Sequence, residues 1–171
     1  MNWFSCKISY EKLMENGVQK KITEQYLVDA LSFTEAEARI IEEMKPYVSG
    51  DFSVADISRY KVSEIFSENR GINQIDAEAQ KISGQNRHAS GIADKWFVCK
   101  VNFIMLDEKS GTEKKNPVNM LVQASSVNAA HDSLVECMKD TLSDYEIEKI
   151  AETKIMDVFS YNIGRNEKID N

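Results

Sequence analysis

Apolar and polar residues alternate near the start of the chain, and the same alternation returns after residue 95. The apolar positions are Phe4, Cys6, Ile8 and Tyr10 in the first stretch and Phe97, Cys99, Val101, Phe103 and Met105 in the second. Because neighbouring side chains of a strand point to opposite faces of a sheet, each stretch predicts a strand with one apolar face. Gly17 and Gly111 follow in turn sequences, where glycine accepts the positive φ of a tight hairpin. Second alternating segments end near Ala30 and Ala124, so each stretch predicts a β-hairpin.

Apolar residues at helical spacing follow each hairpin. They are Phe33, Ala36, Ile40, Ile41 and Met44 after the first hairpin, and Val127, Ala130, Leu134, Val135 and Met138 after the second. Ser32 or Thr34 supplies the N-terminal cap of the first helix, and Pro46 helps to end that helix. A third strand begins near Phe52 and again near Tyr145, and a break in its alternation predicts a bulge or bend. Each unit therefore reads β-β-α-β, with room for a fourth strand.

The two halves of the chain carry identical residues at matching positions, which predicts a tandem duplication of residues 3–66 at residues 96–159. The matches include Trp3 with Trp96, Cys6 with Cys99, Lys7 with Lys100, Ala36 with Ala130, Met44 with Met138 and Phe66 with Phe159. We expect an α+β fold in which a mainly antiparallel sheet, continuous through both units, carries two helices on one face about a pseudo-twofold axis.

The expected organisation has four parts. They are a first repeat at 1–66, a polar connector or mobile arm at 67–95, a second repeat at 96–161 and a polar tail at 162–171. We expect the two repeats to merge into one domain.

Composition and charge narrow the class of protein. The chain has 171 residues, of which 42% are hydrophobic and 29% charged, as in globular proteins. A net charge of −7 disfavours a general grip on nucleic-acid phosphates but leaves room for a local basic face. No apolar segment is long enough for a membrane span, and charges interrupt the first apolar positions, so we expect no signal peptide. Three cysteines without dense spacing favour a reducing compartment, and we expect a cytoplasmic protein.

Longer motifs resemble a known family. They are the opening WFxCKxxYEK, the helix entry YLVDALSFTEAEARIIEEM, and the later segments KVNFIMLDEKSGTEKK and IMDVF. Together they resemble domain of unknown function 4494, found in Bacteroidetes and some of their phages, and the resemblance covers nearly the whole chain apart from residues 67–95. It implies a cytoplasmic protein of bacterial or phage origin, and it brings no activity, cofactor or catalytic residue with it.

Signatures of catalysis are absent from the sequence. It contains no phosphate-binding loop, dinucleotide fingerprint, HExxH zinc motif or nucleophile elbow. His88 and His131 lie in polar surroundings, which favours solvated side chains. Cys6 and Cys99 lie on the apolar face of their strands, which favours small buried side chains of the core. Cys137 lies near the C-terminal end of a helix, whose dipole disfavours a thiolate. We therefore expect no catalytic residue, no metal and no cofactor, and favour a protein that is not an enzyme.

One repeated surface feature points to a ligand. Trp3 and Lys7 share the parity opposite to the apolar face, and lysine pairs open the neighbouring strand in both copies. Bases stack on aromatic rings while phosphates attract ammonium groups, so this pattern predicts a face for single-stranded nucleic acid. The candidate residues are Trp3, Lys7, Lys20, Lys21, Trp96, Lys100, Lys114 and Lys115. The competing interpretation is that each indole packs against its hairpin or between the copies while the lysines keep the sheet soluble.

Other functions stay open at this stage. The acidic first helix, from Glu35 to Glu43, favours a protein-interaction module or a phage-type inhibitor that docks on a host protein. An enzyme with a site at the seam between the copies is a third hypothesis. An incomplete sheet also exposes edge strands, through which two chains can pair into a homodimer.

Overall fold

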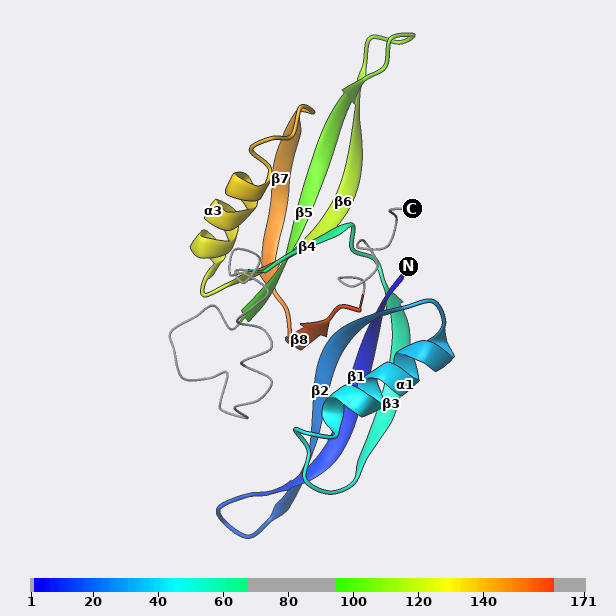
Figure 1. Ribbon diagram of the computed structural model, residues 1–171. Helices are drawn as coiled ribbons and strands as arrows, with labels where there is room; N and C mark the ends of the chain where they lie inside the picture. Colours follow the sequence, from blue (N-terminus) through cyan, green and yellow to red (C-terminus); the bar gives the residue numbers. More distant parts are fainter. Residues whose placement is uncertain (1, 68–94, 162–171) are drawn as a thin grey trace, which may run out of the picture. The chain divides into compact units, whose positions relative to one another are not determined.

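The computed structural model describes residues 2–67 and 95–161 and divides the chain into two compact units (Figure 1). Unit 1 comprises the chain up to Lys61 and again from Lys154, and unit 2 comprises Val62–Thr153. The expected connector at 67–95 and the polar tail at 162–171 lie almost wholly outside the described residues, as does His88. Within the described ranges, no helix is long and apolar enough to cross a membrane.

Unit 1 is a four-stranded sheet with one helix on one face. Its elements are β1 (Asn2–Leu13), β2 (Gln19–Ala30), α1 (Phe33–Met44), β3 (Phe52–Tyr60) and β8 (Ile155–Phe159). The strand order is β3-β1-β2-β8, in which only the β2 to β8 pair is parallel. Gly17 has a φ of +79° in the β1–β2 turn, as the turn sequence predicted. The predicted bulge is also confirmed, because the pairing of β1 with β3 shifts between Lys7 and Ile8.

The apolar side of this sheet packs against α1. Phe4, Cys6 and Ile8 of β1 are fully buried, and with residues of β2 they meet the face of α1 that carries Ala36 and Ile40. The helix starts here because the hydroxyl of Ser32 accepts a hydrogen bond from the Glu35 backbone N–H. The helical stripe and the strand alternation of the sequence therefore bury each other, as predicted.

Unit 2 repeats the same arrangement. Its elements are β4 (Glu64–Phe66), β5 (Lys95–Leu106), β6 (Glu113–Ala124), α3 (Val127–Cys137) and β7 (Tyr145–Glu152). The strand order is β4-β6-β5-β7, with a parallel pair between β4 and β6 and a bulge between Lys100 and Val101. Phe97, Cys99 and Val101 are buried under Ala130 and Leu134 of α3.

Each sheet takes its fourth strand from the other half of the sequence. β4 follows β3 along the chain but pairs with β6 in unit 2, and β8 follows β7 but pairs with β2 in unit 1. The α+β class is thus confirmed, because the described residues form two helices and two mixed sheets of four strands. The single continuous sheet that we expected is wrong, because alternation along a strand predicts its faces but not its neighbours. The duplication itself stays a prediction.

A buried carboxylate holds the end of β8 in unit 1. Asp29 of β2 is 1% exposed. One of its oxygens accepts a hydrogen bond of 2.8 Å from the backbone N–H of Tyr161, and Arg39 of α1 lies 3.5 Å from the same oxygen. Phe159 stacks on the ring of Tyr26, with the ring centres 5.9 Å apart. Because a buried charge needs partners, Asp29 ties the returning chain to both β2 and α1.

The first testable prediction concerns the helix–sheet contact of unit 2. Leu134 is fully buried, whereas Leu142 is fully exposed. Leu134→Ala is expected to lower the free energy of unfolding by about 2–5 kcal/mol, because it leaves a cavity under α3. Leu142→Ala, the same chemical change on the surface, is expected to alter it by less than about 0.5 kcal/mol. Urea denaturation of both variants checks this, and equal stabilities would contradict the assignment of the core.

The second prediction concerns the thiols. Burial raises the pKa of the Cys6 thiol to about 12, with a smaller contribution from the Asp56 carboxylate, and burial raises that of Cys99 to about 11. Cys137 is exposed. Because only the thiolate reacts with a disulfide reagent, one thiol is expected to react rapidly at pH 8 in the native protein and three in denaturant. Cys137→Ser is the control, and rapid labelling of that variant would show that Cys6 or Cys99 is accessible.

Candidate binding surfaces

The outward face of unit 1, opposite to α1, carries part of the predicted nucleic-acid face. Trp3 and Lys7 of β1 and Lys21 of β2 lie on this side, as strand parity predicted. Trp3 is half-buried, whereas Lys7 and Lys21 are exposed. Among the described residues, neither of these lysines forms an ion pair. Two free ammonium groups and a partly exposed indole therefore share one face.

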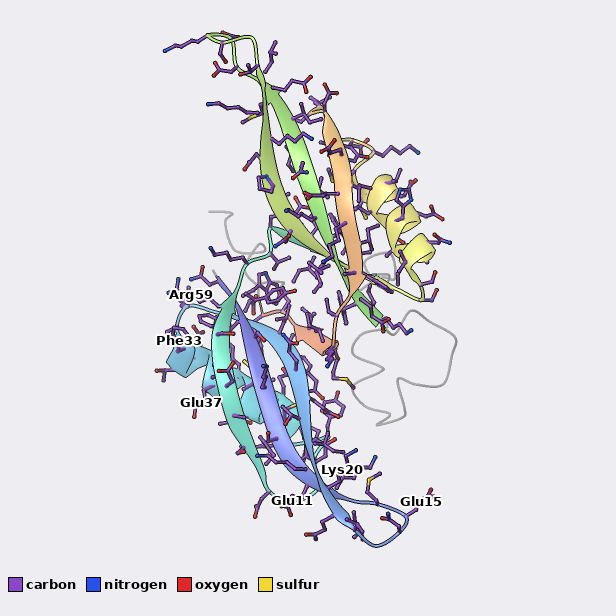
Figure 2. The ribbon with its side chains drawn as sticks, turned by 180° about the vertical axis from the view of Figure 1, so that it is seen from behind. Glu11, Glu15, Lys20, Phe33, Glu37 and Arg59 are labelled. Carbon is purple, nitrogen blue, oxygen red and sulfur yellow. The ribbon has the colours of Figure 1, made fainter. Side chains whose placement is uncertain are left out.

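The second lysine of each pair faces the opposite side of its sheet. Lys20 pairs in register with Lys12 and Lys114 with Met105, and both therefore take the parity of the helix side. Figure 2 shows Lys20 near the turn of the β1–β2 hairpin, with Glu11 and Glu15 close by. Trp3 lies at the other end of the same strand pair, about 30 Å away for nine residues of extended chain. The predicted residues thus do not form one compact patch.

The matching face of unit 2 is neutralised by acidic residues of β7. Lys115 binds Glu146 with 2.6 Å between Nζ and Oε1, and Lys100 lies 3.2 Å from a carboxylate oxygen of Glu148. The side-chain amide of Asn102 donates to both carboxylates, at 3.3 and 2.9 Å. The contacts with Lys115 and Asn102 lower the pKa of Glu146, and those with Asn102 and Lys100 lower the pKa of Glu148.

The Trp96 indole of unit 2 is only 4% exposed. The buried ring of Trp96 is therefore not available for a base to stack on. This burial agrees with the competing interpretation of the sequence, in which the indole packs and the lysines keep the sheet soluble. The sequence predicted equivalent outward faces on the two units, but the lysines of unit 2 are paired with glutamates.

The acidic residues of α1 differ in whether they have partners. Glu35 forms an ion pair with Arg39, Glu42 pairs with Lys45, and Glu43 accepts a hydrogen bond from the hydroxyl of Tyr161. Glu37 forms no ion pair or side-chain hydrogen bond with any residue that the structure describes. It is therefore the carboxylate of this helix that is available to another molecule.

Glu37 lines a shallow, open groove of about 450 Å³ between α1 and β3. The lining residues are Phe33, Thr34 and Glu37 of α1 and Val54, Ala55, Asp56 and Ile57 of β3. Like Glu37, Asp56 has no ion-pair partner within the described ranges. The groove thus has apolar residues and two carboxylates along it, of which Glu37 lies on the α1 side and Asp56, in register with Lys7, on the opposite side of β3.

An aromatic ring marks the start of α1 in this groove. The ring of Phe33 is 48% exposed and packs edge-on against the buried Phe4, with 5.0 Å between the ring centres. The guanidinium of Arg59 lies 6.0 Å from the same ring. Figure 2 shows Phe33, Glu37 and Arg59 on the side of unit 1 where α1 and β3 lie next to each other. This fixed ring offers an apolar contact at the rim of the groove.

The groove runs along an open edge of the sheet. β3 is the last strand in its sheet and pairs only with β1 among the described strands. Its bulge leaves Ala55 without an opposite residue, because Lys7 pairs with Asp56 and Ile8 with Val54. An edge strand presents backbone N–H and C=O groups that lack partners, and these can bind another extended chain.

The matching positions of unit 2 do not carry these acids. His131 of α3 occupies the place of Glu37, and Lys149, which pairs with Lys100, occupies the place of Asp56. Both units form the same strands and helix, so packing does not require acidic residues at these positions. In the sequence, Glu37 is one of several acidic residues of the predicted first helix, and no motif singles out Asp56. The signal that could have identified both acids is the change from Glu37 to His131 and from Asp56 to Lys149 at matching positions of the two halves.

A metal site requires several ligand side chains that lie close together. Within residues 2–67 and 95–161, no three His, Cys, Asp or Glu side chains lie close enough to hold a metal ion together. His131 is exposed and lies 3.4 Å from Asp132, its neighbour in the chain.

Comparison with known proteins shows a family but no activity. No curated protein matches the sequence. A family model with the description "Domain of unknown function (DUF4494)" matches residues 2–161, which confirms the resemblance seen in the motifs. Because this match spans nearly the whole chain, the protein belongs to the family of domain of unknown function 4494.

Proposed function

We propose that the protein is a non-enzymatic interaction module that binds another protein through the acidic groove of unit 1. The observation that carries the proposal is the pair of carboxylates, Glu37 and Asp56, that line an open groove without partners among the described residues. The other acidic residues of α1 are already engaged within unit 1. Two like charges beside one groove attract a cationic partner and repel an anionic one, which gives specificity.

The sheet edge supports the same proposal. A groove between a helix and an edge strand is a recurrent place for peptide recognition, because side chains fill the groove while the backbone meets the strand. The partner is then a protein segment, and a host protein is the class implied by a phage origin. The buried thiols Cys6 and Cys99 support a reducing compartment, and we propose the cytoplasm.

The third prediction tests this function with a displayed library of random twelve-residue peptides. Selection on the wild-type protein is expected to enrich peptides rich in Lys and Arg. These peptides are expected to lose about tenfold in affinity for the double variant E37H/D56K, since two exposed charge pairs contribute roughly 0.2–1 kcal/mol each and their reversal adds repulsion. Fluorescence anisotropy of the selected peptides provides the affinities.

The matched control for this experiment is E11H/E15K. It makes the same change in charge at the far end of the β1–β2 hairpin, which Figure 2 shows apart from α1. Unchanged affinity is expected for this variant. If the selection enriches no peptide, or if both double variants weaken binding equally, the groove is not the binding site.

A second candidate function is binding of single-stranded nucleic acid by unit 1 alone. The observation that favours it is a difference between the units: Lys100 and Lys115 are held by glutamates, whereas the matching Lys7 and Lys21, on the face that carries Trp3, form no ion pair with any described residue. An indole and two free ammonium groups supply one stacking surface and two phosphate contacts. The face is small, so weak and strongly salt-dependent binding is expected.

The fourth prediction separates this candidate from the first. A fluorescein-labelled oligothymidylate of twenty nucleotides is titrated with protein at several salt concentrations. K7A/K21A is expected to reduce the slope of log K against log salt by about 1.4, because each contact with single-stranded phosphate contributes about 0.7. K100A/K115A serves as the control and is expected to leave the slope unchanged. No binding at tens of micromolar protein in low salt would reject the nucleic-acid function and leave the peptide proposal intact.

A further inference from the structure

We infer that the groove of unit 1 takes an extended, basic peptide segment, which adds to the open edge of β3 as a further strand of the sheet. This inference rests on the proposed function and adds to it the mode of binding and the chemistry of the ligand. It concerns an edge strand of nine residues, Phe52–Tyr60, whose single described partner is β1. Backbone groups on the other side of such a strand give affinity to any extended chain that reaches them.

Charge decides which extended chain fits. A strand that pairs with β3 directs alternate side chains toward α1, where Phe33 and Glu37 line the groove, and the others toward the opposite face, where Asp56 lies in register with Lys7. A lysine or arginine on the α1 side meets Glu37, one on the opposite side meets Asp56, and an apolar side chain meets the exposed part of the Phe33 ring. The guanidinium of Arg59 lies 6.0 Å from the centre of that ring and disfavours a basic side chain next to it. The ligand therefore alternates basic and apolar residues on one of its faces.

The second unit shows that this chemistry is specific to unit 1. β7 is likewise the last strand of its sheet and has a bulge at the matching place. Its groove positions carry His131 and Lys149, so a basic strand meets no carboxylate at either position. The acids of unit 1 are thus a feature of its surface and not a requirement of the fold.

A second copy of this chain fits the edge less well. Antiparallel pairing of two β3 strands brings the Asp56 and Glu37 carboxylates of both copies to one seam, and like charges at close range are destabilising. The net charge of −7 adds repulsion between the chains. The bulge at Ala55 also interrupts the edge, as bulges do where sheets avoid extended edge-to-edge pairing. A short segment on one side of the bulge avoids these costs.

The fifth prediction uses a designed probe, the capped peptide TKTVTKTVT, whose lysines and valines share one face of a strand. Anisotropy is expected to show affinity about tenfold higher than for the control peptide TETVTETVT, and E37H/D56K is expected to remove this preference. Two N-methylated forms of the probe test the backbone. Methylation of residues of one parity is expected to weaken binding about tenfold or more, and methylation of the other parity to leave it unchanged, because only alternate residues of an added strand pair with the edge.

Amide hydrogen exchange of residues 52–60 gives a second readout, and the bound probe is expected to slow exchange there but not in β7. In one outcome, the basic probe binds more tightly than the acidic control while neither N-methylated form loses affinity. That result would support the acidic binding surface but would overturn strand addition. If the basic probe does not bind better than the acidic one, the inferred ligand chemistry is wrong. The library selection then shows separately whether the groove binds any peptide. A wild-type dimer in sedimentation that E37H/D56K tightens would identify a second copy as the occupant instead.

Discussion

The structure depends on the burial of one sheet face under one helix in each unit. β1 presents Phe4, Cys6 and Ile8 to α1, and β5 presents Phe97, Cys99 and Val101 to α3. A hairpin alone is marginally stable in water, and the third strand and the helix supply the apolar contact that it lacks. This packing occupies one face of each sheet and leaves the opposite face and the outer edges to form surfaces.

The exchange of the fourth strands determines which edges remain open. β8 closes the β2 side of unit 1, and Asp29 secures the chain that follows it through Tyr161 and Arg39. The β3 side receives no strand among the described residues. Unit 1 therefore has a long open edge beside the N-terminal half of α1, and the groove lies there because the helix and the edge strand flank it.

The two units have the same arrangement of strands and helix but differ in their surface charges. In unit 2, Glu146 and Glu148 of β7 neutralise lysines on the outward face, and the groove positions carry His131 and Lys149. In unit 1, Lys7 and Lys21 on the outward face have no ion-pair partner within residues 2–67 and 95–161, and Glu37 and Asp56 line the groove. Since both sets of residues are compatible with the same strands and helix, the fold does not require these differences in charge. They place the proposed peptide site in unit 1 alone.

The sequence by itself determined the strands, the hairpin turns, the helices with their caps, and the bulges. Side-chain direction along a strand or a helix is a local property with a period of 2 or 3.6 residues, so alternation at Phe4 to Ile8 or spacing at Ala36 to Met44 suffices. Tertiary structure alone decided that β4 and β8 join the opposite sheets, that Trp96 is buried, and that Lys115 meets Glu146. The groove belongs to this second class, because Phe33 and Asp56 come together only when the chain returns from α1 to the sheet edge. Strand pairing and ion pairing bring together residues that are distant in the chain, so the local periodicity of the sequence does not predict them.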